Sequence, residues 1–311
     1  MKNARVAVIT RTKNRSILLK RAMDSILGQK YRDWVHVIVN DGGSPEAVKQ
    51  VLAPNMDRYG DRITIVDNPV SVGMEAASNI GIRNCDSEFV VIHDDDDTWH
   101  PEFLERCVTF MDSKDKPSLG CEYCGVITHS MRILEEMDGE SVKTVGSDPF
   151  NTWLQSVSLY RLASSNTFPP ISFVFYRKVL EEVGYFREDL PVLGDWDFHL
   201  RVCMRYEIGL IPELLAYYHH RTSIKSGDYG NTVHAADYKH LAYDALYRND
   251  LLRRDLREGK AGMGYLVNIG RSFDHLHAQI YPLERALEKM RSFRLFRWLG
   301  RFLYRGGRRR E

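Results

Sequence analysis

Four consecutive aspartates occupy residues 94–97, directly after the apolar run of residues 89–93. An apolar run of this length is typical of a buried strand, so the strand would deliver four carboxylates to one point. Neighbouring carboxylates repel one another, and without a counter-charge some of them would take up protons. Mg²⁺ or Mn²⁺ resolves this conflict, because both ions prefer oxygen ligands and can bridge carboxylates to the phosphates of a nucleotide. The run therefore predicts a metal site.

Strand geometry predicts which of these aspartates act together. If the strand continues to its end, alternation places Asp94 and Asp96 on one face and Asp95 and Asp97 on the other. Two of the four would then serve the metal. An acidic surface turn or a helix N-terminus is the competing interpretation, because Pro101 and the residues after it are typical of a helix start.

The composition is that of a soluble globular protein. The chain has 311 residues, of which 43% are hydrophobic and 27% are charged. This length allows one sizeable α/β domain and an appendage. No apolar stretch approaches the roughly 20 residues of a membrane-spanning helix, and the N-terminus lacks the apolar core of a signal peptide. We therefore expect a cytoplasmic protein, and the five cysteines, an odd number, do not indicate a disulfide framework.

The first hundred residues alternate between strand and helix patterns. We expect strands at residues 5–10, 34–40, 63–66 and 89–93, with helices at 16–27 and 74–84. This order predicts a mainly parallel sheet flanked by helices, and ligands of such sheets bind at the carboxyl ends of the strands. Further along the chain we expect strands at 125–129 and 171–176 and helices at 179–183 and 195–206.

Several short motifs follow one another in a characteristic order. They are residues 10–15, residues 39–44, the glycine and asparagine positions Gly73, Asn79 and Gly81, the aspartates with Trp99 and Pro101, residues 183–186 and residues 195–201. Together they resemble the family-2 nucleotide-sugar glycosyltransferases over about residues 4–226. The resemblance implies a GT-A fold with a nucleotide-binding half (about 1–116) and an acceptor-binding half (117–226). Residues 227–311 would form a helical extension with a basic amphipathic tail.

The resemblance implies that Asp41 binds the base of a nucleotide. A carboxylate at a strand end can accept a hydrogen bond from an imide N–H, and the adjacent Gly42 lets the ring approach the backbone. Thr10 and Arg11 at the end of the first strand, and Asn79 in the matched helix, are the further nucleotide-binding positions that it implies. A simple Asp-Gly turn is the alternative for residues 41–42.

The aspartate run resembles the DxD motif of this family. The resemblance implies that Asp96 is the direct metal ligand, that Asp94 lies near the ribose or the metal, and that Asp95 belongs to the nucleotide site. Which pair engages the metal stays open, because Asp95 fills a position that is commonly a small polar residue. A bound Mn²⁺ or Mg²⁺ stabilises the charge that develops on the β-phosphate as the sugar leaves. His220 matches a family histidine that completes the metal shell or contacts the diphosphate, and a surface role for His219 and His220 is the alternative.

The acceptor hydroxyl needs a general base, because it is a poor nucleophile until its proton is removed. Asp195 matches the aspartate of the family's Glu-Asp motif at the start of a helix, where the helix N-terminus favours a carboxylate. Asp195 as a simple helix cap and Asp197 as the base are the alternatives. Gly194 stands where the family often has glutamate, which removes an acceptor contact and leaves room for a bulkier acceptor.

The C-terminal residues form a basic segment. Residues 291–311 contain eight arginines and one glutamate, a charge of +7; because the whole chain carries +1, residues 1–290 carry −6. The arginines recur at roughly helical spacing among Phe, Leu and Trp, which favours an anionic membrane surface as partner. The alternatives are an RNA-binding arm and a helix docked on the acidic body. Of these partners we expect the membrane and not a nucleic acid.

These observations predict a metal-dependent transferase at the inner face of the cell membrane. It would move a sugar, expected from a UDP-sugar, to a glycan or lipid-linked glycan acceptor with inversion, in the assembly of a bacterial surface polysaccharide. A sugar-nucleotide nucleotidyltransferase is the first alternative, although residues 10–16 lack the glycine-rich loop that it would need. A non-catalytic carbohydrate-binding or scaffold protein is the second.

Overall fold

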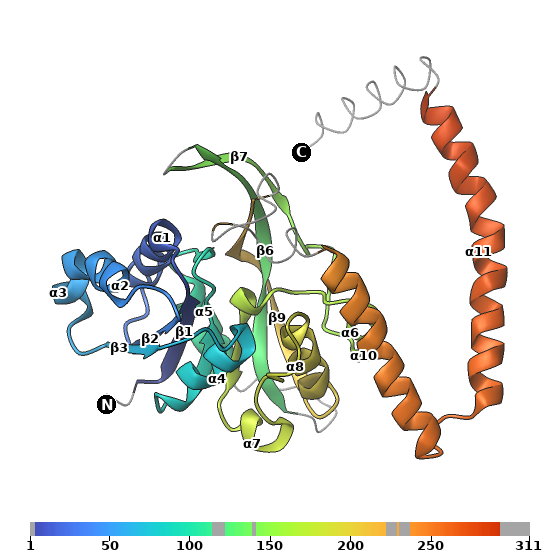
Figure 1. Cartoon of the computed structure of the whole chain (residues 1–311), viewed down its shortest axis with the longest axis horizontal. Coiled ribbons are helices and arrows are strands. Elements are labelled where there is room, and N and C mark those ends of the chain that lie inside the picture. The colour runs from blue at the N-terminus through green and yellow to red at the C-terminus, as the bar shows by residue number, and fades with distance from the viewer. Residues whose placement is uncertain (1–3, 114–121, 139–140, 222–228, 230–236, 293–311) are drawn as a thin grey trace. The chain divides into compact units, whose positions relative to one another are not determined.

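The computed structural model describes residues 4–113, 122–138, 141–221, 229 and 237–292 (Figure 1). The chain divides into two compact units, residues 1–244 and 245–311, and each is described by itself. The predicted boundary between the transferase domain and the extension, at residue 226, lies outside the described residues. It therefore stays a prediction.

Four parallel strands form the N-terminal part of the sheet in the order β3-β2-β1-β4. Their bounds are β1 (Val6–Thr12), β2 (Trp34–Asp41), β3 (Ile63–Asn68) and β4 (Phe89–Ile92). The strand order changes direction between β1 and β4, and in open α/β sheets ligands bind beyond the strand ends at such a point. The predicted mixed α/β fold with a mainly parallel N-terminal sheet is confirmed.

Helices flank this sheet (Figure 1). They are α1 (Ser16–Leu27), α2 (Pro45–Leu52), α3 (Met56–Tyr59), α4 (Met74–Arg83) and α5 (Phe103–Asp112), with a short 3-10 turn at Ala53–Asn55. Helix α1 buries its apolar residues in the core, as its spacing predicts. Helix α4 approaches the sheet closely at Gly81, where an added Cβ would lie 2.4 Å from Cγ2 of Ile9. Only glycine allows this approach of the last turn of α4 to β1, while Asp41 holds the start of the helix by accepting from the amides of Val72 and Gly73.

The second half of the sheet is mixed. Strand β8 (Phe173–Tyr176) pairs antiparallel with β4, and the order continues through β6 (Tyr123–Asp138), β9 (Glu207–His220) and β5 (Thr98–Trp99). Strand β7 (Ser141–Pro149) pairs with β6 off this path. The remaining elements of this half are α6 (Leu159–Ser164), the 3-10 turn Pro170–Ser172, α7 (Val179–Val183) and α8 (Gly194–Cys203).

Strand β9 contradicts the alternative of a surface role for His219 and His220, because both are buried at its end. It runs for 14 residues and ends at His220, paired with β6 as far as Leu134. Likewise β6 continues far beyond the predicted strand at 125–129. In β6, polar residues such as Glu135 interrupt the apolar pattern, and this part of the strand is held by its pairing with β9 and by the buried ion pairs of Glu135.

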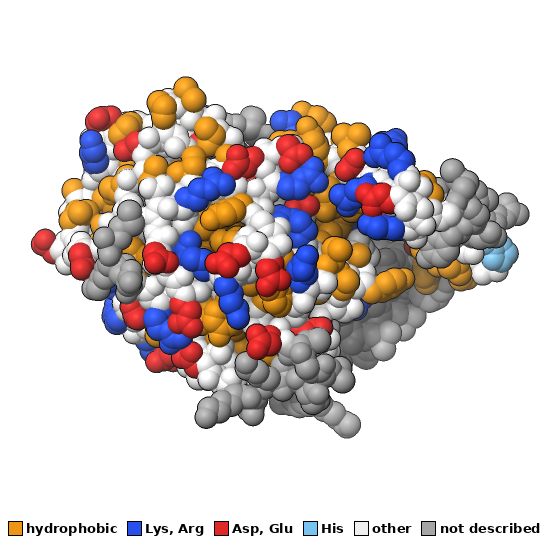
Figure 2. All heavy atoms as spheres, turned by 90° about the horizontal axis from the view of Figure 1, so that it is seen from below, with side chains coloured by type: hydrophobic (Ala, Val, Ile, Leu, Met, Phe, Trp, Pro, Cys, Tyr) orange, Lys and Arg blue, Asp and Glu red, His pale blue; other side chains and the backbone are white. Residues whose placement is uncertain are grey.

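Helices α10 (Asp237–Arg257) and α11 (Met263–Ser292) follow the sheet in sequence. Within the described residues, none of the helices combines the length and the apolar character needed to cross a membrane. Residues 293–311, which make up most of the predicted basic tail, lie outside the described residues. Figure 2 shows acidic and basic side chains interspersed over the described part of one face.

Candidate active site

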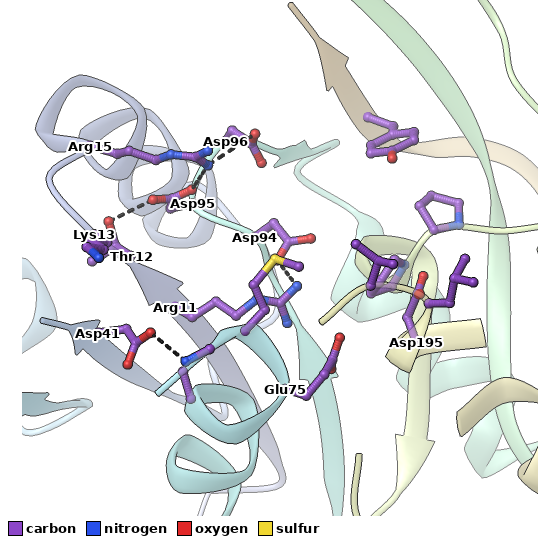
Figure 3. A pocket seen from close by; sticks show the side chains of 18 of the residues that line it. Arg11, Thr12, Lys13, Arg15, Asp41, Glu75, Asp94, Asp95, Asp96 and Asp195 are labelled. Atoms are coloured by element: carbon purple, nitrogen blue, oxygen red, sulfur yellow. Dashed lines mark hydrogen bonds and ion pairs between the residues drawn. The ribbon is translucent and has the colours of Figure 1, made fainter. Parts of the chain in front are cut away.

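A pocket of about 580 Å³ opens at the carboxyl ends of β1, β2 and β4 (Figure 3). Its wall also includes the first turn of α4, the first turn of α8 and the end of β9. Seven of the predicted site residues line it: Arg11, Asp41, Asp94, Asp95, Asp96, Asp195 and His220. The structure therefore brings together residues that lie as far apart in sequence as Arg11 and His220.

Three predicted nucleotide-binding residues do not line this pocket. The Thr10 hydroxyl is fully buried and lies 2.9 Å from Nε2 of His36. The Asn79 amide donates to the Phe186 carbonyl and accepts from the Phe186 amide, so it ties α4 to the second half of the domain. Gly42 has φ +78°, and an added Cβ would lie 2.5 Å from the Ser71 nitrogen, which accounts for a glycine there without a ligand.

The aspartate run is a turn and not a continued strand. Strand β4 ends at Ile92, and the Asp97 amide donates to the Asp94 carbonyl at 3.2 Å. Strand alternation therefore does not apply, and the four carboxylates reach different partners. Asp97 is fully buried and accepts from the His219 amide at 2.9 Å, so it supports the turn from behind.

Arginines supply the counter-charge that the sequence assigned to a metal. Asp94 forms an ion pair with Arg11 at 2.8 Å. Asp95 accepts from the Thr12 hydroxyl at 2.7 Å and pairs with Arg15 at 3.0 Å. Burial raises the pKa of Asp94 to about 6, although Arg11 acts in the opposite direction.

Asp96 is held by a fully buried arginine that the sequence did not indicate. Arg221 donates to its Oδ2, and Arg15 lies 3.6 Å from the same atom. Burial acts to raise the pKa of Asp96, but the guanidinium groups of Arg221 and Arg15 outweigh it and the net direction is downward. Asp96 is therefore held as a carboxylate at neutral pH.

Glu135 of β6 organises the groups behind Asp96. Its carboxylate pairs with Arg21 and lies 3.4 Å from Arg221 and 2.7 Å from Nδ1 of His219. Arg21 also donates to the Asp96 carbonyl at 2.6 Å. No sequence motif predicts this network, because more than 80 positions separate Glu135 from His219 in the chain and a motif covers only neighbouring residues. Of the two histidines, His220 lines the pocket, whereas His219 belongs to this supporting network.

Asp41 lies at the opposite end of the pocket from Asp195 (Figure 3). Its two oxygens accept four hydrogen bonds, from Asn68 Nδ2, Ser71 Oγ and the amides of Val72 and Gly73, at 2.7 to 3.1 Å. Burial acts to raise its pKa, but these donors lower it overall. All acceptor sites of the carboxylate are used in holding the loop before α4, so its predicted contact with a base stays a prediction.

Asp195 lies in the first turn of α8 and faces the pocket. It accepts from Asn166 Nδ2 at 2.8 Å. Burial raises its pKa, against the opposing effects of the Trp196 amide, Arg11 and Asn166. Asp197, the alternative base, is buried in an ion pair with Arg201 at 2.7 Å and does not line the pocket.

Glu75 of α4 occupies the space that Gly194 leaves. A Cβ on residue 194 would lie 2.4 Å from Cδ of Glu75 and 2.6 Å from its Oε1. The expectation that Gly194 leaves room for a bulkier acceptor is therefore wrong, because Glu75 occupies that space. The space is filled by a carboxyl group from another helix.

The pocket carries ligands suited to Mg²⁺ or Mn²⁺. Asp94, Asp96 and His220 all line it. Within the described residues, no three His, Cys, Asp or Glu side chains converge as a ready metal cage. Mg²⁺ is commonly bound by one or two carboxylates and completes its shell with substrate phosphates and water. The donor set therefore fits a cation that is shared with a nucleotide diphosphate.

A comparison with protein-family models shows which family the chain belongs to. Residues 7–183, more than half of the chain, match the model of glycosyl transferase family 2. The chain belongs to this family. The predicted family and the predicted enzyme class, a glycosyltransferase, are thereby confirmed.

Individual relatives are distant. The succinoglycan biosynthesis protein ExoW of Rhizobium meliloti is 27% identical over 172 residues, which are 54% of this chain and about half, 53%, of ExoW. S. aureus TarS 1–349, solved with UDP-GlcNAc, has a TM-score of 0.53 at 16% identity, covering 71% of this chain and 60% of TarS. The mannosyltransferase PcManGT from Pyrobaculum calidifontis, solved with GDP-Man and Mn²⁺, has a TM-score of 0.52 at 18% identity, covering 94% and 85%. These structures confirm the GT-A fold.

Proposed function

We propose that this glycosyltransferase moves a sugar from a nucleotide-diphosphate sugar to a hydroxyl of a glycan or lipid-linked glycan. The observation that carries the proposal is a single pocket with two chemically different sides (Figure 3). Arginines and aspartates of the β1 and β4 ends line one side, and Asp195 lines the other. The complexes of TarS with UDP-GlcNAc and of PcManGT with GDP-Man support this donor class. A UDP-sugar is our proposed donor.

Three cationic side chains on the β1 side of the pocket are suited to a diphosphate. Arg11, Lys13 and Arg15 line it together. Their guanidinium and ammonium groups can bind phosphate oxygens, and Arg11 is oriented by donating to Ser78 Oγ at 2.6 Å. We assign Arg11 to the nucleotide site on this ground, and Asp94 and Asp95 with it because they pair with Arg11 and Arg15.

Asp96 and His220 are the residues that we propose to hold a Mn²⁺ or Mg²⁺ ion, with Asp94 beside them. When bound, the cation supplies Lewis-acid stabilisation of the charge on the leaving diphosphate. Arg221 keeps Asp96 ionised, so its carboxylate does not have to lose a proton before it binds.

Asp195 is the proposed general base. It accepts the proton of the acceptor hydroxyl as the oxygen forms a bond to the anomeric carbon and the bond from that carbon to the β-phosphate oxygen breaks. Asn166 orients the carboxylate toward the pocket at 2.8 Å. A single displacement of this kind inverts the anomeric configuration.

The acceptor class is proposed from a relative. The name of ExoW, a succinoglycan biosynthesis protein, supports a role in polysaccharide assembly. We propose the same for this chain, with residues 291–311 attaching it to an anionic membrane surface on the cytoplasmic side. Retention on vesicles of anionic lipid by the full chain, and its loss when residues 291–311 are deleted, tests the attachment.

Release of nucleoside diphosphate from a panel of UDP-, GDP- and dTDP-sugars, with acceptor glycans and Mn²⁺, tests the transferase chemistry. We expect turnover that needs the metal ion and that is lost in Asp96→Ala and Asp195→Asn. Asp189→Asn is the matched control, because Asp189 is an exposed aspartate shortly before α8 and pairs only with Arg187 among the described contacts. Retained turnover in both pocket variants would contradict the mechanism. Release of pyrophosphate from a nucleoside triphosphate would indicate the nucleotidyltransferase alternative.

A further inference from the structure

Glu75 is a buried acidic residue that the transfer mechanism above leaves without a role. It lies in the first turn of α4, is 5% exposed and lines the pocket. Figure 3 shows its carboxyl group between Arg11 and Asp195. Its Oε2 atom has no hydrogen-bond partner within the described part of the chain. A buried polar atom without a partner destabilises the folded protein, so its retention in a pocket indicates a ligand.

The surroundings of Glu75 do not explain it as a structural residue. The Arg11 charge favours its ionised form, whereas Asp195, Asp94 and Asp197 disfavour it, and burial disfavours it most. A carboxylate in the first turn of a helix stabilises the helix, but an exposed one does so equally well. Glu46 in α2 is such a residue, exposed and outside the pocket.

Gly194 makes this position of Glu75 possible. A side chain at residue 194 would overlap the Glu75 carboxyl, with a Cβ 2.4 Å from Cδ. Helix α4 therefore delivers a carboxyl group to the N-terminus of α8, one residue before Asp195. Two carboxyl groups from different helices then face the same part of the pocket.

We propose that Glu75 accepts a hydrogen bond from a hydroxyl of a sugar held between Arg11 and Asp195, and that Gly194 serves to admit Glu75. This inference rests on the proposed sugar transfer. A sugar hydroxyl can donate the hydrogen bond that buried Oε2 lacks, and a site built for such a hydroxyl discriminates strongly against its loss. The hydroxyl belongs either to the transferred sugar or to the acceptor, and the experiment separates the two.

The main variant is Glu75→Gln, which keeps the shape of the side chain and removes its charge; Glu46→Gln is the matched control. We expect both proteins to fold and to bind UDP or GDP with Mn²⁺ as the wild type does. Glu75→Gln should lower sugar transfer at least about tenfold, and Glu46→Gln should not change it. If the hydroxyl is on the transferred sugar, hydrolysis of the donor by water falls with transfer. If it is on the acceptor, only transfer falls.

The double variant Glu75→Ala with Gly194→Glu moves the carboxyl group from α4 to α8. It should regain part of the transfer that Glu75→Ala loses, because the carboxyl returns to the same part of the pocket. Wild-type transfer and hydrolysis in both Glu75→Gln and Glu75→Ala would overturn the inference, because alanine has no acceptor at all, and so would a Glu75→Gln protein that fails to fold, since the carboxyl would then be structural. If the wild type itself releases no nucleoside diphosphate from any donor of the panel, the proposed function fails and the inference fails with it.

Discussion

The two sides of the pocket hold their carboxyl groups in different ways. On the side that we propose binds the nucleotide, Asp94, Asp95 and Asp96 each pair with an arginine. On the proposed acceptor side, neither Asp195 nor Glu75 forms an ion pair with a residue that the structure describes. An arginine beside a carboxylate favours its charged form and suits cation binding, whereas burial raises the pKa of Asp195 and Glu75 and favours their protonated forms. The proposed function therefore assigns cation binding to arginine-paired Asp96 and proton transfer to Asp195, within one cavity.

The largest expected effect comes from removing the arginine behind Asp96. Arg221→Ala leaves Asp96 and Glu135 buried with less counter-charge, and we expect a loss of about 3 to 5 kcal/mol of unfolding free energy. Arg132→Ala removes a surface pair with Asp148 and should cost less than about 1 kcal/mol. Urea unfolding of both variants measures the difference. Equal losses of unfolding free energy in the two variants would show that the buried pair of Arg221 and Asp96 contributes no more than an exposed surface pair.

Asp195→Asn should abolish proton transfer while leaving the nucleotide side intact. We expect kcat to fall about a hundredfold to a thousandfold, because general base catalysis contributes about that much. Binding of UDP or GDP with Mn²⁺, measured by calorimetry, should be unchanged. Weakened nucleotide binding would show that the two sides are not independent.

The raised pKa of Glu75 makes the free energy of unfolding of the protein depend on pH. Burial raises this pKa from 4.5 to about 7, so the folded protein binds the proton more tightly than the unfolded chain. Stability should therefore be highest below about pH 4.5 for this group and should fall, by about 3 kcal/mol, as the pH rises through 7. The difference in unfolding free energy between wild type and Glu75→Gln, followed from pH 5 to 8, measures this contribution. A constant difference across that range would contradict it.

The smallest expected effect is at Gly194. Gly194→Ala places a methyl group 2.4 Å from the Glu75 carboxyl carbon, and we expect a loss of about 1 to 3 kcal/mol. The loss should shrink when Glu75 is also alanine, because the overlap disappears. Thermal unfolding of the single and double variants gives this coupling. Additive losses would mean that the two residues do not compete for the space.

Local patterns predicted the elements well where one face is apolar. Helix α1 has the predicted bounds, Ser16–Leu27, and the four parallel strands lie where the apolar runs indicated them. Strand β9 and the long part of β6 escaped prediction, because polar residues that are satisfied by distant partners interrupt their apolar pattern. The roles proposed for the site residues remain predictions, although seven of them line one pocket.

The sequence by itself determined the four parallel strands of the first hundred residues, the family and the acidic run at residues 94–97. These follow from local periodicity and from motifs of a few residues, which the chain displays without folding. Only the tertiary structure decided that Arg221, 125 positions away, pairs with Asp96, and that Glu75 fills the space beside Gly194. Such contacts depend on strand order and register across the sheet. A pattern within one segment carries no record of which distant segment will pack against it.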